Sequence, residues 1–208
     1  MALQQLMEAV ISGKTAAVQA EVKDALAAGH RPEQILNEGL IAAMSEVGAR
    51  FERGEFYVPE MLIAARAMQA GLALLRPLLT QQGVALRGKV VIGTVKGDLH
   101  DIGKNLVAMM LEGAGYEILD LGTDVPPERF AAAVREHHPV LLGMSALLTT
   151  TMRNMKAAIE AVDDLGLRSQ VKVIVGGAPL TVEYAKEIGA DGYAPDASRA
   201  VALAKSLL

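Results

Sequence analysis

The stretch "KGDLHDIGKN", residues 96–105, places a histidine between two aspartates directly after an apolar run. His100 follows Asp98 by two residues and precedes Asp101 by one. An imidazole in such a setting serves as a general base, as a metal ligand or as an ordinary turn residue, because its neutral and charged forms interconvert near neutral pH. Each role implies a different protein, and the stretch by itself leaves all three open.

Further polar and small residues follow other apolar runs in the same half of the chain. Ser145 comes after "PVLLGM", and Gly176 and Gly177 end the run "VKVIVGG". If each run is a strand of one parallel sheet, these residues and His100 lie at the carboxyl ends of three strands. Ligands bind at that edge of an open α/β sheet, where the strand order reverses. We therefore expect the functional site there.

Residues 88–208 have the alternating pattern that such a sheet requires. Short apolar runs alternate with helical stretches, which predicts right-handed βαβ units and a five-stranded parallel, doubly wound α/β domain of the flavodoxin-like Rossmann type. The expected strands are "KVVIGTV", "YEILDLG", "PVLLGMSA", "VKVIVGG" and "DGYAP", and the expected helices are 102–113, 127–136, 150–165, 181–188 and 196–206. Asp196 is expected to cap the last helix or to border a ligand.

Residues 1–87 show helical spacing throughout and predict a separate four-helix bundle. Pro32 and Pro59 stand where the first turn of the third and fourth helices tolerates proline. The fourth helix is expected to end before Pro77, ahead of Gly83 and Gly88.

Composition excludes several classes of function. The chain has no cysteine, which removes disulfides, thiolate metal sites, iron–sulfur clusters and sulfur nucleophiles. A net charge of −4 and 3% aromatic residues argue against a nucleic-acid partner. The sequence lacks a signal peptide and an uninterrupted apolar span of about 18 residues, so we expect a cytoplasmic protein with no membrane partner.

Two other site types fit the residues less well. A phosphate-binding loop needs a lysine followed by serine or threonine after its glycines, and "GDLHDIGKN" does not have that spacing. A phosphoacceptor domain would carry acids on the first and third strands and a lysine on the last, where this chain has "YAPD".

A set of residues in a fixed order carries a family resemblance. Asp98, His100 and Gly103 are followed by Ser145 and Leu147, and then by the pair Gly176–Gly177. The set resembles the fingerprint of the cobalamin-binding domain, D-x-H-x-x-G, S-x-L and G-G, found in methionine synthase, in mutases and in corrinoid methyl carriers. The stretch "MSEVGARFERGEFYVPEMLIAARAM" resembles the cap module of the methyltransferase branch, so the resemblance extends over nearly the whole chain.

The resemblance implies that His100 replaces the cofactor's own benzimidazole as a ligand of the cobalt. Imidazole is a suitable nitrogen ligand for this metal, and a metal-bound imidazole donates its other N–H to a carboxylate, which Asp98 is placed to supply. Ser145 is expected to hydrogen-bond that carboxylate and complete a proton relay. His100 is thus the expected metal ligand, and the expected catalytic residues are His100, Asp98 and Ser145.

The displaced nucleotide tail needs a slot, which glycines without side chains can provide. We expect Gly93, Gly143, Gly176 and Gly177 to form it. Asp101 is expected to cap the helix that begins at Ile102 rather than to bind metal. One face of the third bundle helix is expected to shield the corrin, with packing of the bundle core as the alternative. The expected cofactor-binding residues are Asp98, His100, Asp101, Ile102, Gly103, Ser145, Leu147, Thr149, Gly176, Gly177, Met44, Val47 and Phe51.

The implied function is methyl transfer through cobalamin, present as cob(I)alamin and methylcobalamin or as a related corrinoid. A substrate-specific methyltransferase would load the methyl group, an acceptor methyltransferase would pass it to a pterin or a thiol, and a reductive activase would reverse oxidation. The chain would then be a component of an enzyme system rather than a complete enzyme. The alternatives are a cobalamin-dependent sensor, whose relatives carry a DNA-binding module before the bundle, and the cobalamin subunit of a mutase, which the four-helix cap disfavours.

Overall fold

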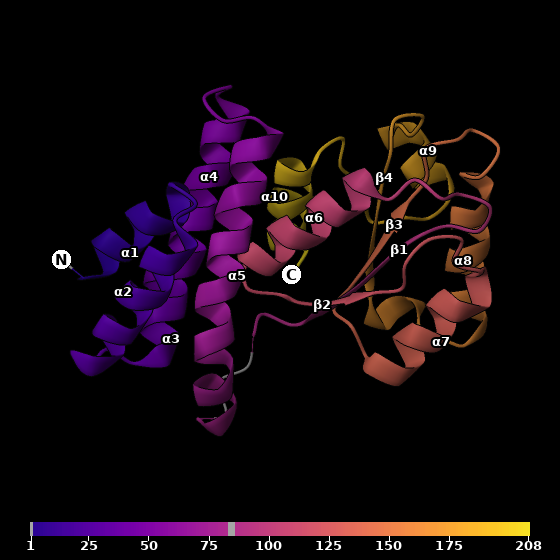
Figure 1. Cartoon of the computed structure of the whole chain (residues 1–208). Coiled ribbons are helices and arrows are strands. Elements are labelled where there is room, and N and C mark those ends of the chain that lie inside the picture. Colours follow the sequence, from indigo (N-terminus) through magenta and orange to yellow (C-terminus); the bar gives the residue numbers. More distant parts are fainter. Residues whose placement is uncertain (1, 83–85) are drawn as a thin grey trace. The chain divides into compact units, whose positions relative to one another are not determined.

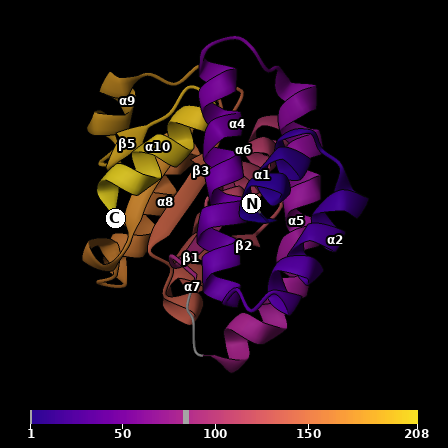
Figure 2. The same ribbon diagram turned by 90° about the vertical axis from the view of Figure 1, so that its left-hand side faces the viewer.

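The computed structural model describes residues 2–82 and 86–208 and contains two compact units (Figures 1 and 2). Unit 1 comprises Met1–Arg87 and Glu112–Gly115, and unit 2 comprises Gly88–Leu111 and Tyr116–Leu208. The predicted architecture, an N-terminal helical part and a five-stranded parallel α/β fold, is confirmed.

Unit 1 is helical, as its apolar spacing predicts. Leu6, Val10, Val18 and Val22 are fully buried and lie on the inner faces of the first two helices. The helical elements are α1 (Ala2–Ile11), α2 (Thr15–Ala27), α3 (Pro32–Gln34), the π-helix η1 (Ile35–Ile41), α4 (Ala42–Glu52) and α5 (Val58–Gln81).

The π-helix is a feature that the sequence analysis did not predict. The expected third helix is present, but its middle segment η1 widens to i→i+5 hydrogen bonding before α4 resumes the α-helical form. Gly39 lies against α1, where a β-carbon would stand 2.6 Å from Leu6 Cδ2. The wider turn brings five of the seven residues of η1 to buried positions, namely Ile35, Leu36, Gly39, Leu40 and Ile41.

The predicted end of the fourth helix before Pro77 is wrong. Helix α5 continues through Pro77 to Gln81. Proline removes the hydrogen bond to the carbonyl of Ala73, but both residues are exposed, so water can reach that carbonyl. Leu75 and Leu79 are buried on either side and favour continuation of the helix. The predicted break at Gly83 lies outside the described residues.

Helix α5 also has the length and apolar composition of a membrane span, and among residues 2–82 and 86–208 it alone does. Its buried positions include Met61, Met68 and Leu72. The core helix of a soluble protein has the same properties, so this observation is weak evidence for a membrane.

Unit 2 is built on one parallel sheet with the strand order β2-β1-β3-β4-β5. The order reverses between β1 and β3, which places the switch point beside these two strands. The register pairs Thr94 with Ser145 and Ser145 with Gly176, so the ends of three strands form one row. The strands are β1 (Lys89–Thr94), β2 (Glu117–Asp120), β3 (Leu141–Ser145), β4 (Lys172–Gly176) and β5 (Gly192–Tyr193).

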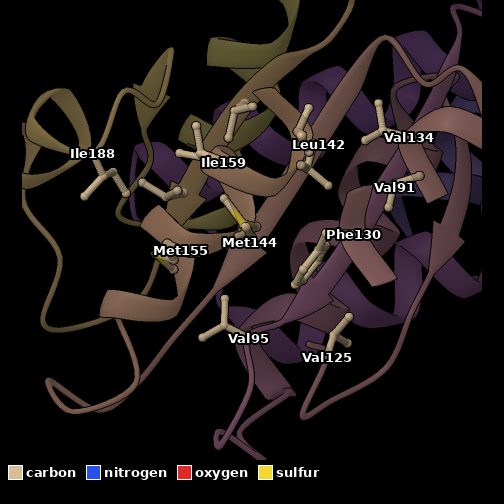
Figure 3. Close-up of a cluster of buried hydrophobic side chains, with 14 of the residues drawn as sticks. Val91, Val95, Val125, Phe130, Val134, Leu142, Met144, Met155, Ile159 and Ile188 are labelled. Atoms are coloured by element: carbon tan, nitrogen blue, oxygen red, sulfur yellow. The ribbon is translucent and has the colours of Figure 1, made fainter. Parts of the chain in front are cut away.

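Both faces of the sheet are covered by helices. Figure 3 shows the apolar cluster on one face, where Phe130 and Met155 from the helices pack against Val91 and Leu142 from the strands. Helices α6 and α10 lie on the opposite side of the sheet from α7 and α8 (Figure 1). The helices of unit 2 are α6 (Ile102–Gly113), α7 (Pro127–His137), α8 (Arg153–Asp164), α9 (Val182–Glu187) and α10 (Ala197–Leu207), with a short 3-10 helix at Arg168–Gln170.

The helices of unit 2 agree with the sequence pattern except at the start of α8. The expected helix began at Thr150, whereas α8 begins at Arg153 because the preceding residues form turns. The Asp196 side chain accepts a hydrogen bond from Arg199 N–H at 2.8 Å, as expected of a helix cap.

Candidate functional site

The loop after β1 is a tight turn that projects His100 beyond the sheet. Asp98 N–H donates to Val95 O at 3.1 Å, which closes a four-residue turn. Gly97 has φ +81°, a value that L side chains rarely adopt and that this turn requires at its third position. Thr94 is fully buried, and its hydroxyl donates to His100 O at 3.0 Å. The end of the strand therefore fixes the backbone of His100.

Asp98 is the fully buried centre of the site. Its Oδ1 accepts from His100 N–H at 3.1 Å and lies 2.7 Å from His100 Nδ1. Its Oδ2 accepts from the backbone N–H groups of Leu147 and Leu148, at 2.8 and 3.3 Å, and from the Thr151 hydroxyl at 2.7 Å. Donors from the loops after β1 and β3 thus converge on one carboxylate.

These contacts set the charge of Asp98. Burial raises the pKa of a carboxyl group, but the hydrogen bonds from Thr151, His100 and the Leu147 amide outweigh burial and hold the pKa of Asp98 well below its usual value. Asp98 is therefore ionised at neutral pH. An ionised carboxylate only accepts hydrogen bonds, so His100 Nδ1 carries the hydrogen atom and donates a hydrogen bond to Asp98.

The other ring nitrogen of His100, Nε2, makes no hydrogen bond with any residue that the structure describes. The side chain of His100 is 52% exposed although its carboxylate partner is buried. A neutral imidazole with Nδ1 protonated has its lone pair on Nε2. The arrangement therefore presents one oriented nitrogen donor at the surface of unit 2.

Exposed apolar side chains lie on the loops after β1 and β3 and at the start of α6. Leu99 and Ile102 are 72% and 84% exposed, and Leu147 and Leu148 are 42% and 41% exposed. A group of exposed large apolar residues beside a polar atom is typical of a binding site for a largely apolar ligand.

The hydroxyl that reaches Asp98 belongs to Thr151 and not to Ser145. The predicted hydrogen bond from Ser145 to the Asp98 carboxylate is therefore wrong. Ser145 instead ends β3, in the row between Thr94 and Gly176. Thr151 lies six residues later, in the turn that brings the chain back over Asp98. Its hydroxyl is also 2.9 Å from Leu148 O, but a hydroxyl has one hydrogen and the ionised carboxylate is the stronger acceptor.

The end of β4 lacks side chains for a steric reason. Gly177 has φ +137°, and a β-carbon there would lie 1.8 Å from Ala146 O. A β-carbon at Gly176 would lie 3.0 Å from Ala194 O. The loop after β4 therefore passes close to the loop after β3.

The other two predicted slot glycines face packed side chains. A β-carbon at Gly93 would lie 2.8 Å from the ring of Phe130, and one at Gly143 would lie 3.2 Å from Ile92 Cγ1. Their missing side chains make room for the core of unit 2, so they are not openings for a ligand.

The remaining predicted residues of this loop region lie around the site. Asp101 stands at the start of α6, where its carbonyl accepts from Asn105 N–H at 2.8 Å. Its carboxylate accepts from the Asn105 side chain at 3.0 Å, instead of from the helix backbone as expected of a cap. Gly103 and Thr149 are exposed, and a β-carbon at Gly103 would meet nothing within 4 Å.

The three predicted cap residues lie on α4 in unit 1. Met44 and Val47 are buried, and Met44 packs against Gly113, where a β-carbon would stand 3.0 Å from Met44 Cγ. Phe51 is half-buried. Packing therefore accounts for Met44 and Val47, and the role of all three toward a ligand stays a prediction.

A metal centre made of protein ligands alone is not present in the part of the chain that the structure describes. Across residues 2–82 and 86–208, no three His, Cys, Asp or Glu side chains gather closely enough to hold an ion. His100 offers a single nitrogen, which suits a metal that arrives with its other ligands already in place. The donor set of this site therefore fits a corrin-bound cobalt.

Comparison with known families agrees with this arrangement. Residues 88–202 match the family described as B12 binding domain, and residues 2–76 match a second family with the same description. The first match contains the whole constellation around Asp98, and together the matches span most of the chain.

Two curated relatives and one solved structure extend the comparison. The dimethylamine corrinoid protein of Methanosarcina barkeri is 47% identical over 99% of this chain and 97% of its own length. The trimethylamine corrinoid protein 1 of Methanosarcina mazei is 43% identical over 89% of this chain and 87% of its own length. A chain in the crystal structure of the methanol:cobalamin methyltransferase complex MtaBC from Methanosarcina barkeri matches with a TM-score of 0.84 and 28% identity, over 99% of this chain and 79% of that chain.

Proposed function

Because this chain belongs to the B12-binding family of corrinoid proteins, we propose that it binds its corrinoid through His100 Nε2 and carries methyl groups between two methyltransferases. The corrinoid cofactor and the general role of a methyl carrier follow from membership of the family. The proposal adds the ligand atom, the displacement of the cofactor's own base and the identity of the partners.

The observation that carries the proposal is the orientation of the His100 ring. Asp98 is ionised and accepts from Nδ1, so the lone pair of Nε2 points away from the carboxylate. A histidine that served only as a turn residue would not need a buried carboxylate with donors from two loops. The free Nε2 is the atom that would hold the cobalt.

The surroundings of His100 also fit a corrin. The exposed leucines Leu99, Leu147 and Leu148 would pack against an apolar ring and exclude water from the ligand nitrogen. We also propose that a displaced nucleotide tail passes beside the end of β4, where Gly176 and Gly177 add no side chains to the closely spaced backbone of the loops.

When bound, the corrinoid supplies a metal that accepts a methyl group and releases it to an acceptor. The residues of this chain would orient the ligand nitrogen. The Nδ1–H group of His100 bonds to Asp98, and Thr151 and two backbone amides hold the Asp98 carboxylate in place.

We propose a methylated amine as the methyl donor and, as the first partner, a methyltransferase specific for it. The support is the identity with relatives named for dimethylamine and trimethylamine. The likeness to a chain of a methyltransferase complex supports a partner of this class. The acceptor methyltransferase, for a pterin or a thiol, and a reductive activase complete the proposed system, which we expect to operate in the cytoplasm.

The test is the electron paramagnetic resonance spectrum of the full chain reconstituted with cob(II)alamin whose benzimidazole nitrogens are 15N-labelled. We expect a triplet splitting from an unlabelled nitrogen, which must come from the protein. The His100→Ala variant is the matched control, and it should bind the corrinoid but lose the triplet. A 15N doublet in the wild-type protein would mean that the benzimidazole stays on the metal and would overturn the proposal.

A further inference from the structure

The segment between β2 and α7 contacts the loop that carries His100. Asp124 Oδ1 accepts from Gly97 N–H at 2.7 Å, and Asp124 N–H donates to Asp98 O at 3.0 Å. One residue thus uses its side chain and its backbone to hold two consecutive residues of the turn. Neither contact involves the Asp98 carboxylate, so Asp124 acts on the loop from outside the polar network.

Asp124 has a backbone conformation that is uncommon for its residue type. Its φ is +54°, and among the residues that the structure describes only one other non-glycine residue, His138, has a positive φ. Aspartate tolerates this region better than most residues, but the conformation still costs free energy. Such conformations persist where the surrounding structure fixes them, and they concentrate at functional sites.

The neighbours of Asp124 do fix it. Val125 N–H donates to Thr94 O and Thr94 N–H donates to Gly122 O, both at 2.9 Å, so the segment is bonded to the end of β1 on both sides of Asp124. Val95 and Val125 form a parallel bridge. Thr94 is therefore hydrogen-bonded to the segment that bears Asp124, and Val95 is paired with it.

The segment is also anchored at its beginning. Asp120, at the end of β2, accepts from Gly122 N–H at 2.8 Å and pairs with Lys104 of α6. Lys104 is buried, and its Nζ donates to the Asn105 side chain at 2.7 Å. The buried Lys104 therefore ties the beginning of the segment to α6.

We propose that Asp124 is a positioning residue, which clamps the Gly97–Asp98 backbone and so holds His100 in the orientation in which Nε2 can bind cobalt. The inference rests on the proposed function of His100. Other contacts hold the same loop: the Asn154 side chain donates to Lys96 O at 2.7 Å, and the Thr94 hydroxyl donates to His100 O. Asp124 adds the bonds to Gly97 N–H and to Asp98 O.

The experiment compares the full-length wild-type protein with Asp124→Gly and Asp124→Asn. Glycine adopts a positive φ without strain but lacks the carboxylate, so this variant removes the bond to Gly97 without adding backbone strain. Asparagine keeps an acceptor oxygen and tolerates the same φ. His138→Gly is the matched control, because it replaces the second non-glycine residue of positive φ among the described residues, which follows α7 and precedes β3.

The first measurement is amide hydrogen exchange of the cobalamin-free protein. In Asp124→Gly the Gly97 amide should exchange about fivefold faster than in the wild-type protein, and in Asp124→Asn and His138→Gly it should stay within about twofold of wild type. An unchanged rate in Asp124→Gly would overturn the proposal.

The second measurement is the resonance spectrum with 15N-labelled cob(II)alamin. We expect a partial loss of the unlabelled-nitrogen triplet in Asp124→Gly and a wild-type triplet in Asp124→Asn. A full triplet in Asp124→Gly, together with fast exchange at Gly97, would mean that the clamp does not position His100 and would overturn the inference alone. Absence of the triplet from the wild-type protein would instead overturn the proposed function, so the two failures are distinguishable.

Discussion

The ends of β1 and β4 belong to one row of the sheet, yet they contribute to the site in opposite ways. At the end of β1, Asp98 gathers donors from two loops and fixes the His100 ring. At the end of β4, Gly176 and Gly177 contribute no side chain. The backbone of the loop after β3 occupies the space that a side chain at position 177 would need. Hydrogen bonds determine which residues are required at the end of β1, and lack of space for a side chain determines them at the end of β4. The two ends should therefore fail differently when they are mutated.

The largest effect is expected at the glycine end. Gly177→Ala would place a β-carbon 1.8 Å from Ala146 O and would force two loops apart. We expect the free energy of unfolding of the cobalamin-free protein to fall by about 4 kcal/mol and corrinoid binding to be lost. Urea denaturation and absorption titration measure these quantities.

The control for this change is Gly189→Ala. Gly189 also has a positive φ, +79°, but a β-carbon there would meet nothing within 4 Å. The control should lose about 1 kcal/mol, from backbone strain alone, and should still bind the corrinoid. Equal losses in the two variants would show that contact with Ala146 is not what makes glycine necessary at position 177.

The next effect is expected at the centre of the polar end. Asp98→Asn would replace one carboxylate oxygen by an NH2 group, which cannot accept hydrogen bonds. At least two of the groups that now donate to Asp98 would lose their acceptor. We expect a loss of about 3 kcal/mol in the free energy of unfolding, measured by urea denaturation at pH 7. Asp101→Asn is the control on the same loop, and it should lose less than about 0.5 kcal/mol because Asp101 bonds one side-chain amide.

The stability difference between the wild-type protein and Asp98→Asn should depend on pH. The pKa of Asp98 is lowered by folding, so the ionised carboxylate contributes stability above the pKa of the unfolded chain, about 4, and loses it as the pH falls further. Urea denaturation at pH 7, 4 and 3 should show a difference that is constant above pH 5 and smaller at pH 3. A difference that grew on acidification would contradict the assigned charge state.

The smallest effect separates the two hydroxyl residues. Thr151→Val keeps the shape of the side chain but removes the donor to Asp98, and it should cost about 1.5 kcal/mol in the free energy of unfolding. Ser145→Ala should cost less than about 0.5 kcal/mol, since its hydroxyl makes no bond to Asp98. A larger loss in Ser145→Ala than in Thr151→Val would restore the role that the sequence first gave to Ser145.

Much of the fold and part of the site could be predicted from the sequence. The fold follows from alternating apolar runs and turn residues, and the elements of unit 2 were predictable because each run is short, apolar and bounded by polar residues. Asp98 and His100 were recognisable because carboxylate and imidazole are chemically distinctive. Gly177 was recognisable as part of a pair that closes a strand.

The donors that complete the site could not be identified from residue types. The Leu147 and Leu148 amides belong to the backbone, which every residue has, and Thr151 is one of three consecutive threonines in "LLTTTM". Which threonine reaches Asp98 depends on the turns that precede α8. Gly93 was misleading for a similar reason, because the space beside it is filled by Phe130 from a helix far along the chain.

The convergence of donors on Asp98 has a consequence for protein design. The motif D-x-H looks like a short cassette that one could graft onto any parallel strand. Yet Leu147 lies 49 residues from Asp98 and Thr151 lies 53 residues away, and both bond the same carboxylate oxygen. A graft without the second loop would leave a buried, poorly solvated acid that gains a proton and releases the imidazole. The smallest transplantable unit is therefore two adjacent strands with both of their loops.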